Sequence, residues 1–245
     1  MRGLVGAWRL ARLHRGRRGL LRSAGGELPG SARRLLEAPC PGVRQEVHTV
    51  PFLALDLETT GLDPESDGIV AFGWVAVEGD LLLGSARHRI LREARTGGET
   101  IHGIVHDLRS EGHELGEVLE EFAEAACGRL LVAHHLPMET GFLAAATAHA
   151  WGVNIPFAGV DTLALERRMG QRMGGGQVPD PAVPEEIDGE AGAFRLSAAR
   201  ARYGLGDHRL HDALSDAVAA GELFLAQMKR LEERLGRPPR LGDLL

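Results

Sequence analysis

The sequence has few of the features that mark membrane, disulfide-rich or zinc-binding proteins. No apolar run approaches the roughly 18 residues that a membrane span needs. The two cysteines, Cys40 and Cys127, lie far apart and have no metal-type spacing, so neither a disulfide framework nor a zinc site is indicated. Lys229 is the only lysine, and no internal repeat is evident. With 44% hydrophobic and 25% charged residues, the composition is that of a soluble globular protein. Because no disulfide framework is indicated, we expect free thiols and a cytoplasmic location.

Charge is distributed unevenly along the chain. The formal net charge is −6, yet residues 1–50 contain ten Arg and three Glu, a formal +7, and the remaining residues carry −13. The Arg-rich start lacks the apolar core and small-residue cleavage pattern of a secretory signal. An organellar transit peptide, a basic arm for nucleic acid, a membrane surface or a partner, and a solvated extension all remain open.

The 245 residues suit one domain with short arms. We predict an Arg-rich extension over 1–50, a globular domain over 51–231 and a short tail over 232–245. Residues 170–192 are rich in Gly, Pro, Gln and acidic residues, a composition that predicts a flexible insert within the domain.

Hydrophobic patterning predicts an α/β domain. Short connections between the first three expected strands, at 51–57, 69–77 and 81–91, indicate an antiparallel meander. Two more strands are expected, at 130–133 and 155–160. Helical spacing predicts helices at 115–127, 137–151, 161–169, 196–203 and 211–231. This order predicts a mixed sheet with helices on both faces.

The first strand ends in the motif D-L-E-T-T-G at 56–61. Because a strand repeats its facing direction every two residues, Asp56 and Glu58 point the same way, about 7 Å apart. Two carboxylates on an apolar strand are costly unless a cation lies between them, and such hard oxygen ligands suit Mg²⁺ or Mn²⁺. The alternative is a strand end whose acids only contact water, and the hexapeptide alone does not distinguish the two.

Two further acids follow at the expected crevice beyond the strand ends. Glu139 comes shortly after the fourth strand, and Asp216 lies in the last helix. Four carboxylates can meet in one crevice only if cations balance them. His211 precedes Asp216 by five residues, about 140° around a helix, so it can reach a reacting water. The alternatives are a surface histidine beside Asp212 and, for Glu139, an acid favoured by the helix dipole.

Three ordered blocks make residues 51–230 resemble the DEDDh 3′–5′ exonucleases, typified by the epsilon subunit of bacterial DNA polymerase III and built on the RNase H-like fold. The first block is D-L-E-T-T-G. The second, at 132–143, is similar to the family's A-H-N-A-x-F-D and downstream F-L, with His135 where Asn is usual and Glu139 where Asp is usual. The third, H-D-A-L-S-D-A at 211–217, fits H-x-A-x-x-D-A.

Two shorter segments, I-H-G-I at 101–104 and D-T-L at 161–163, resemble intermediate features of the same family. The resemblance implies two-metal hydrolysis of terminal phosphodiesters with His211 as general base. Two divalent cations, Mg²⁺ or Mn²⁺, would be held by Asp56, Glu58, Glu139 and Asp216. The pocket for the terminal nucleotide would be lined by Thr59, Thr60, Ile101 and His102.

The expected substrate is the 3′ end of DNA, with single strands favoured and proofreading or repair as the setting. A DNA polymerase or another repair protein is an expected partner. An exonuclease acting on RNA or short oligonucleotides, and a catalytically impaired nucleic-acid-binding module, remain as alternatives.

Overall fold

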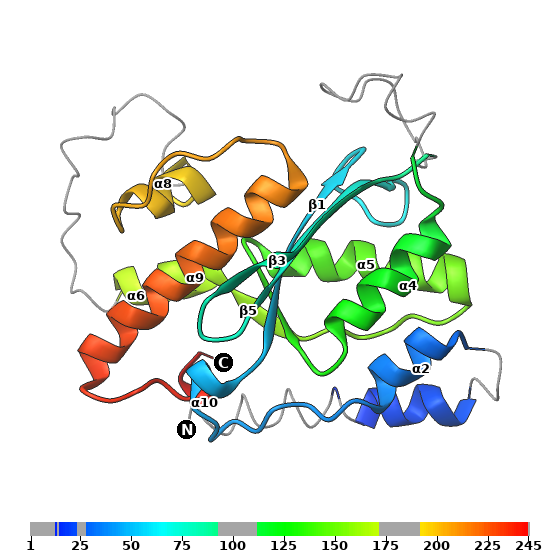
Figure 1. Cartoon of the computed structure of the whole chain (residues 1–245), viewed down its shortest axis with the longest axis horizontal. Helices are drawn as coiled ribbons and strands as arrows, with labels where there is room; N and C mark the ends of the chain where they lie inside the picture. The colour runs from blue at the N-terminus through cyan, green and yellow to red at the C-terminus, as the bar shows by residue number, and fades with distance from the viewer. Residues whose placement is uncertain (1–12, 14, 24–27, 93–111, 172–191, 245) are drawn as a thin grey trace.

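A computed structural model describes residues 13, 15–23, 28–92, 112–171 and 192–244. Within these residues a five-stranded sheet has the order β3-β2-β1-β4-β5 (Figure 1). The strands are β1 (Phe52–Thr59), β2 (Ile69–Val77), β3 (Leu81–Ile90), β4 (Leu130–Ala133) and β5 (Gly159–Asp161). β1, β2 and β3 pair antiparallel, whereas β4 is parallel to β1 and to β5. The predicted mixed sheet with a three-strand meander is therefore confirmed.

The helices labelled in Figure 1 cover both faces of the sheet, as expected. They are α2 (Gly30–Glu37), α4 (Leu115–Ala126), α5 (Leu136–Trp151), α6 (Thr162–Gln171), α8 (Leu196–Ala201), α9 (Ala213–Leu235) and α10 (Leu241–Leu244). α9 crosses one face over β1 and β2, and α4 and α5 lie on the other. None of the helices in the described ranges is long and apolar enough to cross a membrane.

The strand expected over 155–160 is shorter than predicted, because β5 begins only at Gly159. Ile155 is fully buried, but its backbone N–H donates to the Thr147 hydroxyl of α5 (3.1 Å) instead of to a neighbouring strand. Pro156 has no N–H to offer. The apolar run at 155–160 thus predicted the burial of Ile155 correctly, but this residue is buried without pairing to another strand. Of the expected insert at 170–192, residues 172–191 lie outside the described part of the chain.

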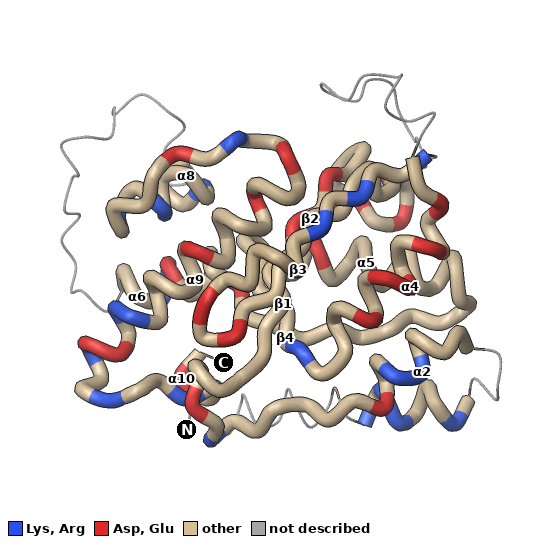
Figure 2. The backbone as a smooth tube through the Cα atoms, viewed as in Figure 1, with Lys and Arg blue, Asp and Glu red and all other residues tan. Residues whose placement is uncertain are grey.

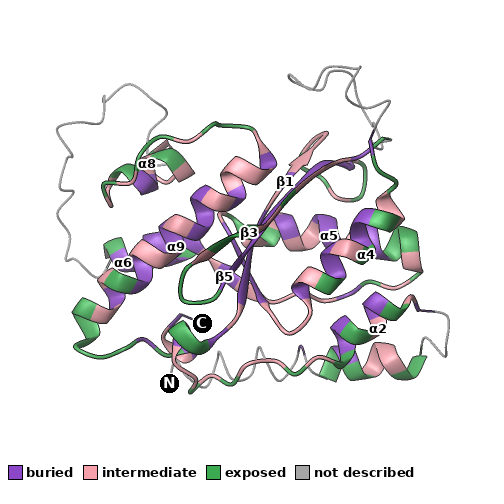
Figure 3. Ribbon diagram, in the orientation of Figure 1, coloured by how far each residue is buried: buried purple, intermediate pink, exposed green. Residues whose placement is uncertain are grey.

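β1 divides its side chains between two hydrophobic cores. Leu53, Leu55 and Leu57 join the core beneath α4 and α5, whereas Phe52 and Ala54 join the core beneath α9. Strand periodicity therefore directs Asp56 and Glu58, which continue the Phe52 series, toward the face that α9 covers. β2 beside it is buried along its whole length (Figure 3).

The segments on either side of the expected domain pack onto it. α2 lies against α4, and its Ala32, Leu35 and Leu36 are buried. Near the C-terminus, Leu241 is fully buried, and the carbonyl of Pro239 accepts a hydrogen bond from the Val47 N–H (2.8 Å). Described residues on both sides of the range 51–231 therefore pack against the core of the domain. The apolar side of α2 needs to be buried against other parts of the protein, even though the surrounding segment is rich in Arg.

Candidate acidic metal site

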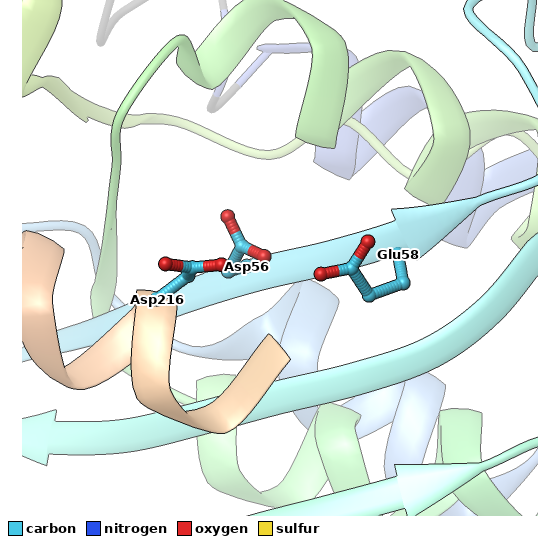
Figure 4. Close-up of side chains that lie close together, drawn as sticks. All are labelled: Asp56, Glu58 and Asp216. Atoms are coloured by element: carbon cyan, nitrogen blue, oxygen red, sulfur yellow. The ribbon is translucent and has the colours of Figure 1, made fainter. Parts of the chain in front are cut away.

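Three carboxylates converge where β1 meets the first turn of α9. Asp56, Glu58 and Asp216 each offer an oxygen, and these oxygens lie within 4.8 Å of one another (Figure 4). Asp212 caps α9, because its Oδ1 accepts the backbone N–H of Ser215 (3.0 Å). The cap fixes where the helix begins and so where Asp216, four residues later, faces the strand.

A glycine allows this approach. Gly73 of β2 is the pairing partner of Asp56. A Cβ on Gly73 would lie 2.1 Å from both the carbonyl carbon and the carbonyl oxygen of Ala213, the first residue of α9. Such distances are impossible for a real side chain, so only glycine lets the helix start sit directly over the sheet beside Asp56.

Glu139 reaches the same place from the first turn of α5. Its side chain is 5% exposed, and Oε2 has no hydrogen-bond partner among the described residues. Glu139 is not one of the three acids whose oxygens fit within 4.8 Å, but its charge acts on Asp56, and the charge of Glu58 acts on it. The structure therefore places Glu139 near the other three acids, outside the group that meets within 4.8 Å.

Burial and mutual repulsion disfavour the charged forms of these acids. Burial raises the pKa of Asp56 well above its usual range, and the charges of Glu139, Asp216 and Glu58 add to the effect. Burial also raises the pKa of Glu139 to about 8, with Glu58 adding and a backbone hydrogen bond from Leu57 opposing. The pKa of Glu58 is raised for the same reasons, burial first and Asp216 next.

No Lys or Arg in the described ranges forms an ion pair with any of the four acids. A largely buried acid cluster without a Lys or Arg partner carries a large electrostatic penalty. The donor set consists of hard oxygens, and one of them, Glu139 Oε2, is buried without a partner. Both observations fit divalent cations such as Mg²⁺ or Mn²⁺.

Two histidines face the acids, and only one was expected. His211 is exposed and lies before α9, with a left-handed φ of 58°, so the helical angle expected between it and Asp216 does not apply. Burial raises the pKa of the Glu58 carboxyl, and the nearby His211 opposes this effect. His208 places Nε2 at 2.9 Å from Asp216 Oδ1. The only sequence signal for His208 is its position, three residues before His211.

The expected substrate-lining threonines shape the turn after β1. The Thr59 hydroxyl donates to the carbonyl of Gly61 (2.7 Å). The Thr60 hydroxyl accepts the Gly68 N–H (3.0 Å) and donates to Asp67 (3.3 Å). These bonds hold the turn in one conformation next to the acids. Ile101 and His102 lie outside the described residues.

The segment after β4 explains one departure from the family pattern. His135 has a left-handed φ of 86°, a region in which Asn and His are both enriched. Its N–H donates to Asp161 Oδ1 (3.0 Å), which also accepts the N–H of Leu163 (3.0 Å), so Asp161 caps the start of α6. The preceding His134 bonds the Thr162 hydroxyl (2.9 Å) and the carbonyl of Phe194 (2.8 Å).

The chain is similar in sequence to known exonuclease domains. The family model RNase_T, described as Exonuclease, matches residues 53–224. The DNA polymerase III PolC-type protein of Thermotoga maritima is 27% identical over 185 residues, which cover 74% of this chain and 12% of that protein. The PolC-type protein of Staphylococcus saprophyticus is 28% identical over 192 residues, 76% of this chain and 12% of that protein. The chain thus spans a small part of the length of these relatives.

Solved structures share the fold. Cell-death related nuclease 4 (CRN-4) superimposes with a TM-score of 0.59 at 15% identity, over 78% of this chain and 65% of the nuclease chain. Exonuclease I of E. coli, in complex with a dT13 oligonucleotide, superimposes with a TM-score of 0.56 at 18% identity, over 76% of this chain and 43% of that chain. At these identities the likeness establishes the architecture alone.

Proposed function

The chain belongs to the RNase_T exonuclease family, and we propose that it is a metal-dependent 3′–5′ exonuclease that hydrolyses terminal phosphodiesters of DNA. One observation carries this proposal. Asp56, Glu58 and Asp216 bring oxygens within 4.8 Å of one another, and the one basic side chain that the described residues place at ion-pair distance from them is His208, beside Asp216. One imidazole does not balance three carboxylates, so the cluster needs further positive charge.

Two divalent cations, Mg²⁺ or Mn²⁺, would be held by Asp56, Glu58, Glu139 and Asp216. When bound, they supply positive charge at the scissile phosphate and lower the pKa of water. The carboxylates keep the site negative enough to retain the cations, and burial shields the attraction between acids and cations from solvent.

His211 is proposed as the general base. Its exposed side chain stands before α9 and acts on Glu58, so it can face both solvent and the acids. It would accept the proton of the water that attacks the terminal phosphodiester, while the bond to the 3′ oxygen breaks and a nucleoside monophosphate leaves. Thr59, Thr60, Ile101 and His102 are proposed to contact the terminal nucleotide.

Single-stranded DNA is the proposed substrate. The PolC-type relatives are DNA polymerases by name, and the E. coli exonuclease I neighbour was solved with a dT13 oligonucleotide. Incubation of 5′-labelled single-stranded DNA and RNA of one sequence with Mg²⁺ tests this proposal. We expect the DNA to shorten progressively from its 3′ end, and unlabelled DNA to compete better than RNA.

The matched variants are Asp56→Ala, which removes one of the clustered acids, and Glu65→Gln, which removes an exposed acid that is not one of the four. Activity should be lost in Asp56→Ala and in chelator, and should be retained in Glu65→Gln. Shortening from the 5′ end, or activity that survives both the Asp56 change and chelator, would overturn the proposal. A preference for RNA would favour the alternative of an exonuclease that acts on RNA. Binding of nucleic acid without turnover would favour the alternative of a catalytically impaired binding module.

A DNA polymerase or repair protein is proposed as a partner through the basic N-terminal segment. Arg15, Arg18 and Arg22 are exposed on the helical stretch 15–23, and Figure 2 shows further Arg on the neighbouring α2. Deletion of residues 1–50 would remove buried α2 side chains, so the better test replaces these three Arg with Ser. Co-sedimentation with a purified DNA polymerase of the same organism should weaken in the triple variant, and an unchanged affinity would refute this contact.

A further inference from the structure

The loop between α8 and α9 brings a second histidine onto a proposed metal ligand. His208 Nε2 lies 2.9 Å from Asp216 Oδ1, and the two side chains are only 7% and 13% exposed. The atoms are close but are not aligned as a hydrogen bond, and Nε2 has no other partner among the described residues. Oδ1 of Asp216 therefore lies against the edge of the His208 ring.

Arg200 fixes the loop that carries His208. This arginine is 4% exposed, and its guanidinium donates to the carbonyl of Gly206 (2.9 Å) and to the carbonyl of Ala219 in α9 (2.8 Å). It also pairs with Glu222 of α9 (2.7 Å). One planar group thus joins the loop to the helix that bears Asp216, with the directional fork that Arg provides and Lys does not.

The other end of the loop is held as well. The backbone N–H of Arg209, next to His208, donates to the Ser215 hydroxyl (3.1 Å), one residue before Asp216. His208 therefore sits between an anchor at Gly206 and an anchor at Arg209. Both anchors end on α9, so the position of the imidazole is tied to the helix that presents Asp216.

The burial of His208 distinguishes it from His211. His211 is exposed and faces Glu58, as a base that acts on water must be. His208 has little access to solvent and touches Asp216 directly. We propose that His208 is a positioning residue, which restricts the rotation of the Asp216 carboxylate so that its other oxygen is presented to the cation, and that Arg200 holds His208 in place. The inference rests on the proposed function, because it assigns Asp216 to the metal.

Partners that orient metal ligands typically contribute about 10–100-fold to metal affinity or activity. The test compares Mn²⁺ binding by isothermal titration in the wild-type chain, His208→Leu, His208→Gln and Arg200→Met. His149→Gln, on the exposed face of α5, is the matched control. We expect Mn²⁺ affinity to fall about 10–100-fold in His208→Leu and Arg200→Met, and to recover in part in His208→Gln, whose amide can contact Asp216.

A second readout separates positioning from a general loss of structure. The Mg²⁺ concentration for half-maximal exonuclease rate should rise in His208→Leu, while KM for single-stranded DNA stays within about twofold. Wild-type Mn²⁺ affinity in folded His208→Leu and His208→Gln would overturn the inference. Turnover that is absent in the wild type while Mn²⁺ still binds would refute the proposed function, and the binding series would still test His208.

Discussion

Gly73 and Ala213 meet through backbone atoms alone, and this contact sets the separation of two elements that carry the acids. Gly73 pairs with Asp56 across β1 and β2, and Ala213 begins the helix that presents Asp216. A Cβ at position 73 would overlap the Ala213 carbonyl group. The acidic cluster therefore depends on a residue that contributes no side chain to it.

Replacing Gly73 with Ala should displace the start of α9 and separate Asp216 from Asp56. We expect a loss of stability of about 1–3 kcal/mol, typical of overpacking, and a fall in exonuclease rate of more than about tenfold, since small misplacements of reacting groups are costly. Gly84→Ala is the matched control, because Gly84 lies in β3 and a Cβ there would meet open space. Equal rates in the two variants would contradict the role given to Gly73.

Divalent cations should stabilise the folded chain. A ligand at 100 times its dissociation constant adds about 2.7 kcal/mol to the free energy of unfolding, so Mg²⁺ or Mn²⁺ should raise Tm by several degrees in thermal unfolding. Asp56→Asn should abolish most of this increase, and Glu65→Gln should retain it. An equal increase in the Asp56 variant would mean that the cation binds elsewhere.

Glu139→Gln should stabilise the metal-free protein and impair the metal-bound one. Because the pKa of Glu139 is raised from 4.5 to about 8, the neutral carboxyl favours the fold below pH 4.5, and this contribution is lost as the pH rises through about 8. The amide stays neutral, so its advantage in chelator should grow over that interval. Urea unfolding at several pH values measures it, and Mn²⁺ titration should show weaker binding. A constant difference between the two proteins across pH would contradict the prediction.

His134 should make the fold sensitive to mild acid. Burial lowers its pKa below the usual 6.5, although the bond to Phe194 opposes the shift. The neutral ring therefore stabilises the fold above pH 6.5, and the contribution is lost as the pH falls through the lower folded-state value. His134→Gln should lose less stability than the wild type between pH 7 and pH 5 in urea unfolding. The exposed His149→Gln variant should follow the wild type.

The N-terminal helix α2 should behave as part of the domain. Leu35 is 1% exposed within the core that α4 shares, so Leu35→Ala should cost about 2–5 kcal/mol in a single unfolding transition. Leu62, which is 81% exposed, supplies a Leu→Ala control with a change below about 0.5 kcal/mol. A negligible effect at Leu35 would restore the view of residues 1–50 as a solvated arm.

Most of the secondary structure could be predicted from the sequence, and so could the convergence of Asp56, Glu58 and Asp216. Apolar runs and helical spacing report which face of a segment is buried, and that property is local. Asp56 and Glu58 shared a direction because strand periodicity required it, and the ordered motifs around Glu139 and Asp216 indicated that they belong to one site. The short strand at Gly159 shows the limit of such patterns, because Ile155 is buried without pairing.

The tertiary structure decided which remote residues meet. The need for glycine at position 73 depends on a helix that begins 140 residues later, at Ala213. The hydrophobic pattern of the sequence does not indicate that this helix and β2 come so close. His208 resembles any loop histidine until Arg200 ties its loop to α9. The same holds for Val47 and Pro239, whose hydrogen bond joins the segment before β1 to the segment after α9. Local pattern determined the elements and the direction of the acids, whereas packing between distant segments determined the distances on which the proposed metal binding depends.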